Sequence, residues 1–235
     1  APLSANPFIT QPVFVSKAIR EKGRNMCVYS HKIVRHKDGS KQRYGTLLKA
    51  ATTTQPSIMA VDAGFSNNSF SMVVGSRNAA GIISVDCIAE IIPLPGIPLN
   101  YTLIFDELLI PLCQKRNVKV LLADQWNSIK LLQDAKLKGG IDEADKYSLK
   151  YSDLWTVKTM LESEVPRISL PRMQHAEKIG DTLLYDGEQY PYCFENKPTE
   201  HLIMQIQTVQ DTGRSVIKNM GATDDSWRAM ALMVY

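Results

Sequence analysis

The stretch IMAVDAGFSNNSFSMVVG, from Ile58 to Gly75, decides how the rest of the chain is interpreted. It opens with an apolar run, Ile58 to Val61, whose composition is typical of a buried strand. Asp62 follows directly, and a Gly/Asn turn then leads into a second apolar run, Phe70 to Val74. Because a lone charge at the end of a buried strand is costly to desolvate, we expect Asp62 to be paired or to bind a metal.

The main domain is predicted to begin with three strands, Ile58 to Val61, Ser69 to Gly75 and Gly81 to Ile92, whose short turns favour an antiparallel meander. A helix capped by Asn100 or Thr102 should then run to about Arg116. The next apolar run, Val118 to Ala123, also ends on a carboxylate, Asp124. A strand that is reached through a helix lies parallel to its neighbour, so the first and fourth strands should be adjacent.

The rest of the chain is predicted to be mostly helical. The expected helices are Asn127 to Lys138, Ser152 to Glu164, Thr199 (as cap) to Val209, and Ser226 to Tyr235. A short strand is expected from Arg167 to Leu170, and Asp186-Gly187 between apolar flanks indicates a hairpin turn. Helices on a mixed sheet place the chain in the α/β class.

Acidic residues recur at the ends of these predicted elements. Asp62 and Asp124 end two adjacent strands, and Asp224 and Asp225 begin the last helix. Crowded carboxylates repel one another unless a cation intervenes, and hard oxygen ligands suit Mg²⁺ or Mn²⁺. Two such ions, roughly 3.5–4 Å apart, support phosphodiester hydrolysis. Each residue alone has a simpler interpretation, since a strand-ending Asp is often a turn former and Asp224 or Asp225 can cap the helix.

The first 57 residues are interpreted as a basic lead-in or linker, which can pack on the main domain formed by residues 58–235. A hairpin is expected through His36-Lys37-Asp38-Gly39. Although the net charge of the 235 residues is only +3, cations gather before Ser57 and are opposed there by Glu21 and Asp38 alone. This asymmetry indicates nucleic acid or another polyanion, although a solvated basic face explains it too. The cations are Lys17, Arg20, Lys22, Arg24, Lys32, Arg35, Lys37, Lys41, Arg43 and Lys49.

The cysteines and the apolar runs bound the protein class. Four widely spaced cysteines without metal-ligand spacing favour free thiols in a reducing compartment. No signal peptide and no apolar run of membrane-spanning length is present. The chain starts on Ala rather than Met and ends on a helical pattern, so we expect a domain excised from a longer protein.

Three motifs, VDAGFSNNSFSMVV (61–74), VLLADQWNS (120–128) and GATDDSWRAMAL (221–232), resemble the nuclease domain of the large terminase subunit of tailed bacteriophages. The resemblance extends over about Ile58 to Tyr235. It implies an RNase H-like fold and metal-dependent cutting of concatemeric double-stranded viral DNA during packaging in the host cell cytoplasm. Implied partners are an N-terminal ATPase motor domain, the small terminase subunit and the portal. No GxxxxGK[ST] loop occurs here, which fits a part without the motor.

Carried over residue by residue, the resemblance implies that Asp62, Asp124 and Asp225 are catalytic. The metal ligands would be Asp62, Asp124 and one of Asp224 and Asp225, with Asp225 favoured, and two Mg²⁺ or Mn²⁺ ions would be the cofactors. Many relatives carry a further acidic residue three positions after the Asp pair, where this chain has Arg228.

Several other residues are candidates for binding or for shaping the site. Phosphate contacts are assigned to Lys130, Lys136, Lys138, Arg167 and Arg172, each of which can equally be a solvated surface charge. Trp126 and Asn127, beside Asp124, can shape the wall of the site, although Trp126 can equally pack in the core. Asn67, Asn68 and Ser69 can orient a phosphate or a water molecule, although a plain turn explains them better.

Other functions stay open at this point. An RNase H-like resolvase or transposase would share the carboxylates. An actin-like ATPase would share the opening strand, Asp-x-Gly and turn, although those proteins need two duplicated lobes. A non-catalytic module could bind nucleic acid through the basic segment alone. A prediction separates this last possibility, because Asp62→Ala would then leave function intact.

Overall fold

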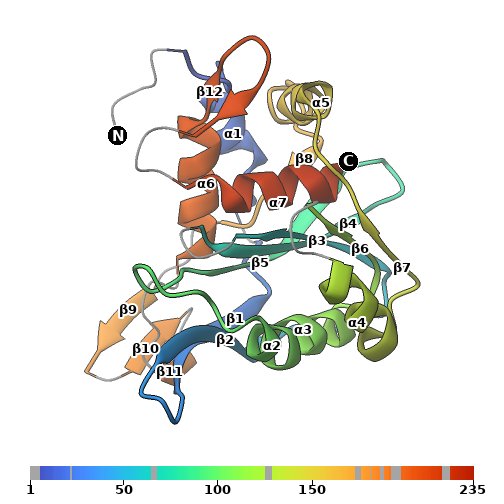
Figure 1. Ribbon diagram of the computed structural model, residues 1–235. Helices are drawn as coiled ribbons and strands as arrows, with labels where there is room; N and C mark the ends of the chain where they lie inside the picture. The colour runs from blue at the N-terminus through green and yellow to red at the C-terminus, as the bar shows by residue number, and fades with distance from the viewer. Residues whose placement is uncertain are drawn as a thin grey trace.

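The computed structural model describes residues 6–21, 23–64, 68–124, 129–172, 176–180, 182–185, 188–191, 197–218 and 223–235. Within these ranges a six-stranded sheet lies between two layers of covering elements (Figure 1). Its strand order is β7-β6-β3-β4-β5-β8. The strands are β3 (Ser57–Ala63), β4 (Phe70–Arg77), β5 (Ile83–Ile91), β6 (Val118–Ala123), β7 (Glu143–Lys146) and β8 (Ile168–Ser169).

The directions of the strands confirm the predicted fold class. β3, β4 and β5 form an antiparallel meander, and β6 lies parallel to β3 with Val61 opposite Ala123. β7 continues the sheet parallel to β6, and β8 pairs in parallel with the start of β5. Three antiparallel strands followed by parallel ones make the RNase H-like arrangement that the sequence predicts.

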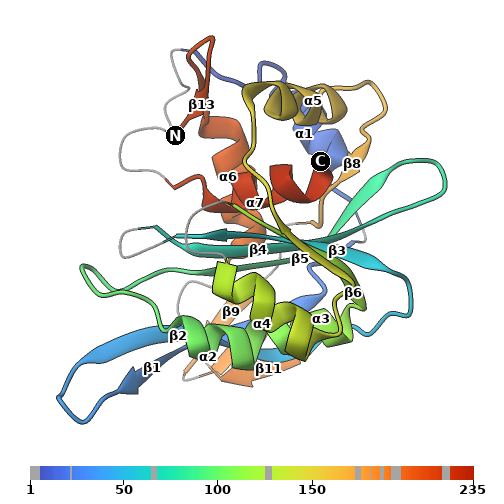
Figure 2. The same cartoon turned by 45° about the vertical axis from the view of Figure 1, so that its right-hand side comes forward.

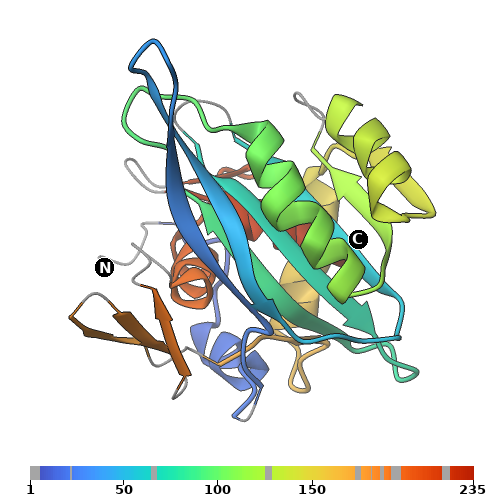
Figure 3. The same cartoon turned by 90° about the horizontal axis from the view of Figure 1, so that it is seen from below.

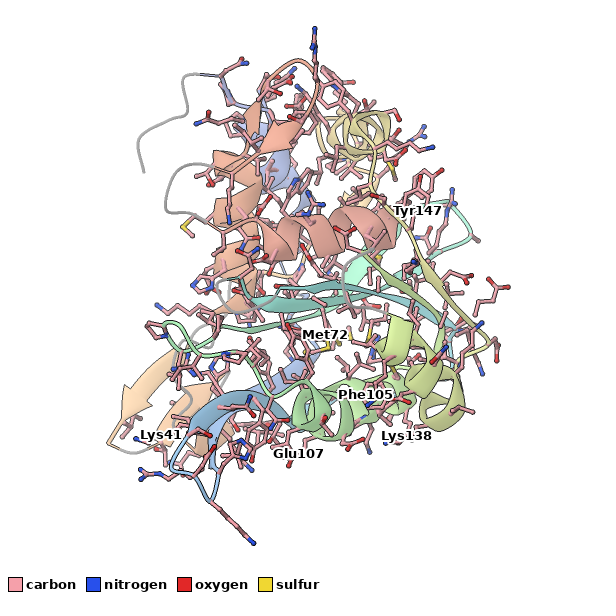
Figure 4. The ribbon with its side chains drawn as sticks, in the orientation of Figure 1. Lys41, Met72, Phe105, Glu107, Lys138 and Tyr147 are labelled. Carbon is pink, nitrogen blue, oxygen red and sulfur yellow. The ribbon has the colours of Figure 1, made fainter. Side chains whose placement is uncertain are left out.

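Both faces of the sheet are buried, and successive residues of a strand supply opposite faces. Met59 and Val61 belong to one apolar cluster, whereas Ala60 between them belongs to the other. Met72 packs in the first cluster and points from the sheet toward the helices of that layer (Figure 4). Burial on both sides explains why these strands read as continuous apolar runs rather than as alternating patterns.

Different elements cover the two faces (Figures 1 and 3). One layer holds the hairpin β1 (Cys27–Arg35) and β2 (Lys41–Ala50) with the helices α2 (Tyr101–Ile104), η1 (Phe105–Leu109), α3 (Ile110–Lys115) and α4 (Ile129–Gly139). The other holds α1 (Pro12–Ala18), α5 (Tyr151–Leu161), α6 (Pro198–Thr208) and α7 (Asp225–Val234). The helix α7 lies across β3 and β4, and this contact positions the candidate site.

The expected helix from Thr102 to Arg116 is helical over Tyr101–Lys115, and the prediction of one regular helix is wrong in its centre. Phe105–Leu109 forms a π-helical turn in which the N–H of Ile110 bonds to the carbonyl of Phe105. Pro111 follows at once, and a proline ring clashes with the carbonyl four residues back in a regular α-helix. The wider turn relieves this conflict. Asn100 caps the helix, since its side chain accepts a hydrogen bond from the N–H of Leu103 at 3.0 Å.

Other boundaries differ for local reasons. The edge strand β7 was not predicted because its sequence, EADK, is mostly charged and exposed. Thr199 is not the cap of α6, which starts at Pro198 after Lys197, a position that suits the fixed φ of proline. The helix α5 ends at Leu161, before the predicted Glu164, where Glu162 accepts hydrogen bonds from the N–H groups of Thr10 and Gln11.

Three further strands form the predicted hairpin region: β9 (Ala176–Ile179), β10 (Thr182–Tyr185) and β11 (Glu188–Pro191). β10 and β11 are antiparallel, so the hairpin is confirmed, although its Asp186-Gly187 turn lies outside the described residues. A small pair, β12 (Gln210–Asp211) and β13 (Val216–Ile217), follows α6.

The first 57 residues supply core side chains on both sides of the sheet. Phe8 and Val15 are fully buried in the cluster around α7, and Tyr29 is buried in the opposite cluster. The predicted hairpin is present, with Arg35 opposite Lys41 beside its turn. Whether the domain boundary belongs at residue 57 stays a prediction.

The cysteines and the lengths of the helices bear on the class of protein. Cys27, Cys87 and Cys113 are buried free thiols, and Cys193 lies outside the described residues. In the ranges that the structure describes, every helix is too short or too polar to span a bilayer.

Asp86 on β5 is a buried acid, 4% exposed, that accepts a hydrogen bond from Arg116 at 3.2 Å. This contact ties β5 to the end of α3.

Candidate metal centre

Strand alternation directs Asp62 and Asp124 to the same face of the sheet. Asp62 is two residues after Ala60, which belongs to the apolar cluster beneath α7, so its side chain points to that side. Asp124 stands two residues after Leu122, which packs against the same cluster. The N–H of Asp124 donates to the carbonyl of Val61 at 3.2 Å, so β6 ends beside the residue that precedes Asp62.

A guanidinium from α7 joins these two carboxylates. Nε of Arg228 lies 3.4 Å from Oδ2 of Asp62, and Nη2 donates to Oδ2 of Asp124 at 2.8 Å. The side chains of Asp62 and Asp124 are only 14% and 16% exposed. Asp62 is therefore paired, as expected, and its partner is Arg228 in the first turn of α7.

Asp225 is held at the start of α7 by the loop that follows β3. It is 2% exposed, and its Oδ2 accepts a hydrogen bond from the N–H of Ser69 at 3.1 Å. Gly64 allows the backbone of Ser69 to approach closely, because a Cβ there would lie 2.2 Å from the carbonyl oxygen of Ser69. The carboxylate of Asp225 thus has a fixed position beside the end of β3.

Asp224 occupies the N-cap position of α7 and is half-buried. After burial, which is the largest cause, the negative charge of Asp224 contributes to the raised pKa of both Asp62 and Asp225. Among the described residues its side chain makes no capping hydrogen bond. Asp225 is therefore the more firmly positioned member of the pair.

The carboxylates perturb one another electrostatically. Burial, followed by the negative charge of Asp225, raises the pKa of Asp62 to about 7, although Arg228 opposes this shift. Burial also raises the pKa of Asp225 to about 7, against the effect of the hydrogen bond from Ser69. For Arg228, burial lowers the pKa, but the hydrogen bond to Asp124 and the charge of Asp62 outweigh it, so the net shift is upward.

The donor set fits a hard divalent cation, because it consists of carboxylate oxygens gathered at one end of the sheet. The guanidinium of Arg228 already stands between two of them as a positive charge. Within the described ranges no three Asp, Glu, His or Cys side chains are arranged to hold a metal ion as they stand. Asp62, Asp124 and Asp225 would be the ligands if side chains adjust, with Asp224 adjacent.

The predicted phosphate-binding residues fall in two places. Lys130, Lys136 and Lys138 lie on α4, and Lys130 lines a cavity of about 400 Å³ that Ala63 and Tyr101 also line. Lys138 pairs with Asp106 at 3.0 Å and lies 5.4 Å from the centroid of the Phe105 ring (Figure 4).

Arg167 and Arg172 instead flank β8, which pairs with Ile83 and Ser84 at the far end of β5 from the carboxylates. Arg167 is exposed, whereas Arg172 is half-buried. DNA contact by any of these five residues stays a prediction. Asn67, Trp126 and Asn127 lie outside the described residues.

Sequence reasoning missed Tyr101. Its hydroxyl donates to the carbonyl of Gly64, next to the loop that holds Asp225. Burial and the charge of Asp62 raise the pKa of Tyr101 to about 12, so it remains a neutral hydrogen-bond donor. Nothing in the sequence marks it, because Tyr101 stands at an ordinary helix start.

Sequence reasoning also missed a second buried acid, Glu90. It is 2% exposed on β5, and its Oε2 lies 2.9 Å from Nδ1 of His201 on α6. Gln205 lies 3.5 Å from Glu90 and accepts a hydrogen bond from the N–H of Trp227, which ties α6 to α7. A charge within the apolar run CIAEII was a usable signal, since a buried carboxylate requires partners.

Comparison with solved structures places this geometry in a known fold. The large terminase nuclease from thermophilic phage G20c, a structure with bound magnesium, is similar with a TM-score of 0.54 and 9% identity over 98% of this chain and 97% of that one. This chain has the fold of a large terminase nuclease domain. The large terminase of bacteriophage HK97 is similar over 78% of this chain and 40% of that one, with a TM-score of 0.50 and 12% identity. This chain thus spans less than half of the HK97 protein.

Comparisons based on sequence alone add no relative. The chain matches no protein-family model and no curated protein. At 9% and 12% identity, the two structures establish the fold, and the chemistry must be argued from the residues of this chain.

Proposed function

We propose that this chain is a divalent-metal-dependent endonuclease that cuts double-stranded viral DNA during genome packaging in the host cytoplasm. The observation that carries the proposal is the convergence of Asp62, Asp124 and Asp225 at one end of an RNase H-like sheet. The magnesium in the G20c nuclease supports a divalent ion in this fold. An ATPase motor domain, a small terminase subunit and a portal are the partners that we propose for the whole protein.

The proposed chemistry is two-metal-ion hydrolysis of a phosphodiester bond. When Mg²⁺ or Mn²⁺ is bound, it activates a water molecule and stabilises the charge that develops on the leaving oxygen. The protein contributes the positions of the ligands: Asp62 and Asp124 come from adjacent strands, and Ser69 fixes Asp225. Asp62 and Asp225 must lose their protons to bind metal, and a cation beside them favours that loss.

The comparisons do not favour the alternatives that the sequence left open. Both similar structures are terminases, rather than resolvases, transposases or actin-like ATPases. The described residues form one large sheet of six strands, beside smaller sheets of two or three strands. The actin-like alternative requires two duplicated lobes.

The test is nicking of supercoiled plasmid in Mn²⁺, Mg²⁺ or EDTA, with wild type beside Asp62→Ala and Asp124→Ala. We expect metal-dependent nicking by the wild type and a loss of at least roughly 100-fold in both variants, because each removes a ligand. Asp145→Ala is the matched control, since Asp145 is an exposed acid on the edge strand β7. Cutting that persists in EDTA, or that survives both substitutions, would contradict the proposal.

A further inference from the structure

Arg228 takes the position that a cation needs between the two strand-end carboxylates. It contacts Oδ2 of Asp62 at 3.4 Å and Oδ2 of Asp124 at 2.8 Å. Its own side chain is 33% exposed, about twice as exposed as either carboxylate. The Arg228 side chain is therefore partly open to solvent while its nitrogen atoms bind the acids.

The backbone beneath Arg228 is fixed independently of this contact. Trp227, the preceding residue, is 1% exposed in the core, and its N–H donates to Gln205 at 2.9 Å. The first turn of α7 is held by the bond from Ser69 to Asp225. The Arg228 side chain can therefore leave the carboxylates by rotation about its own bonds, without movement of the helix.

We propose that Arg228 is a built-in counter-cation which a divalent metal ion must displace in order to bind Asp62 and Asp124. The proposal rests on the metal-dependent function proposed above. A guanidinium and a metal ion that share these two oxygen atoms would lie within a few ångströms of each other and repel in a partly buried site. Each therefore excludes the other, and Arg228 sets the concentration at which the metal enters.

Once displaced, the Arg228 side chain can bind a phosphate group of the DNA. Arg228 is a long side chain on the first turn of α7, and at 33% exposure it can reach an anion that approaches from solvent. Guanidinium groups bind phosphate strongly through paired N–H donors. A DNA phosphate at the site would therefore help the metal by drawing Arg228 away from Asp124.

The test is calorimetric titration of the chain with Mn²⁺ alone. We expect Arg228→Gln and Arg228→Ala to bind Mn²⁺ at least roughly tenfold more tightly than wild type, because the competing charge is gone. The Mn²⁺ affinity of Arg228→Lys should lie between that of wild type and that of these two variants, since an ammonium group is a point charge that cannot bridge both acids in the same way. Arg77→Ala is the control, an exposed arginine at the far end of β4.

Circular dichroism and thermal melting establish that each variant is folded. Arg228→Gln retains the side-chain stem and a polar end, so it serves if Arg228→Ala does not fold. Binding of Mn²⁺ by folded Arg228→Gln that equals or falls below wild type would overturn displacement by Arg228, while plasmid nicking by the wild type would leave the nuclease proposal standing. Absence of Mn²⁺ binding in every variant, together with absence of nicking, would overturn both.

Discussion

The N–H of Ser69 donates a hydrogen bond to Oδ2 of Asp225 at 3.1 Å, across 156 positions of sequence. Ser69 directly precedes β4 and Asp225 begins α7, so this bond joins the start of β4 to the helix that carries Arg228. Asp225 is consequently both an anchor for the site and a candidate metal ligand.

Asp225→Asn separates these two roles. An asparagine retains an oxygen that can accept the bond from Ser69, but it removes a buried charge that repels Asp62. We expect the metal-free variant to melt no lower than wild type, and its melting temperature to lose the rise that Mn²⁺ causes in wild type. Thermal melting with and without Mn²⁺ measures both, with Asp145→Asn as the exposed control. A variant with an undiminished response to Mn²⁺ would exclude Asp225 as a ligand.

The raised pKa values make the stability of the metal-free protein depend on pH. The pKa values of Asp62 and Asp225 rise from 3.8 to about 7 on folding. Between pH 3.8 and 7 the folded chain therefore binds more protons than the unfolded chain. With respect to these groups, the free energy of unfolding should therefore be highest below about pH 4, fall as the pH rises from 4 to 7, and level off above 7. The loss is on the order of 4 kcal/mol per group as an upper limit.

Urea unfolding in EDTA from pH 5 to 8 measures this dependence. The double variant Asp62→Asn with Asp225→Asn isolates it, because other titrating groups contribute equally to both proteins. We expect the wild type to lose stability relative to the double variant as the pH rises. A difference that is constant over this range would show that these acids are already ionised in the folded protein at pH 5. Affinity for Mn²⁺ should change in the opposite direction and increase with pH, since metal binding requires ionised carboxylates.

Sequence patterns could predict where Asp62 and Asp124 lie because strand geometry dictates it. A helix between two apolar runs forces parallel neighbours, and alternation along each strand assigns the face. The contact of Arg228 with both acids could not be predicted, since it depends on the rotation of α7 and on a long side chain. Sequence spacing shows only that Arg228 stands one turn after Asp225.

Elements without an apolar pattern could not be predicted from the sequence either. The strand β7 pairs with one neighbour only and needs few apolar residues, so EADK carries no strand signal. The π turn before Pro111 is a response to packing as well as to the proline ring, and the sequence alone shows only the proline. Local patterns therefore define the interior of the sheet better than its edges and irregular turns.

The basic hairpin β1–β2 gives a prediction about DNA. Tyr29 donates to the carbonyl of Glu90 at 3.0 Å and Arg43 to that of Ile92 at 2.9 Å, so the hairpin runs along β5 toward the end of the sheet where Asp62 lies. Its turn projects beyond that end (Figure 2) and carries the exposed Lys37, and the exposed Lys41 follows as the first residue of β2. Exposed lysines in that place are suited to phosphate contact near the cut.

Charge reversal tests which basic surface faces DNA. We expect Lys37→Glu with Lys41→Glu to weaken binding of a short duplex in EDTA and to lower the slope of log K against log salt by about 2 or more. Arg167→Glu, at the opposite end of the sheet, should change binding less if the hairpin is the DNA-facing surface. Fluorescence anisotropy at several salt concentrations measures both. A larger loss with Arg167→Glu would favour the predicted contacts around β8 instead.

Phe8 offers a test of whether the first 57 residues are part of the folding unit. Its side chain is fully buried, and its ring centroid lies 6.2 Å from that of Trp227 and 5.8 Å from that of Trp155. Truncation to alanine leaves a cavity beneath α7, so Phe8→Ala should lower the free energy of unfolding by about 3–5 kcal/mol. Val13→Ala, in the same segment but 60% exposed, should change it by less than about 0.5 kcal/mol.

Urea unfolding followed by tryptophan fluorescence reports on this directly, because Trp155 and Trp227 border Phe8. A single transition that shifts as a whole in Phe8→Ala would mean that the segment and the sheet unfold together. The carboxylate site would then depend on the segment too, since Trp227 precedes Arg228 and packs against Phe8. If the main transition of Phe8→Ala were unchanged, or if a separate early transition appeared, residues 1–57 would be an appendage to a domain that begins at Ile58.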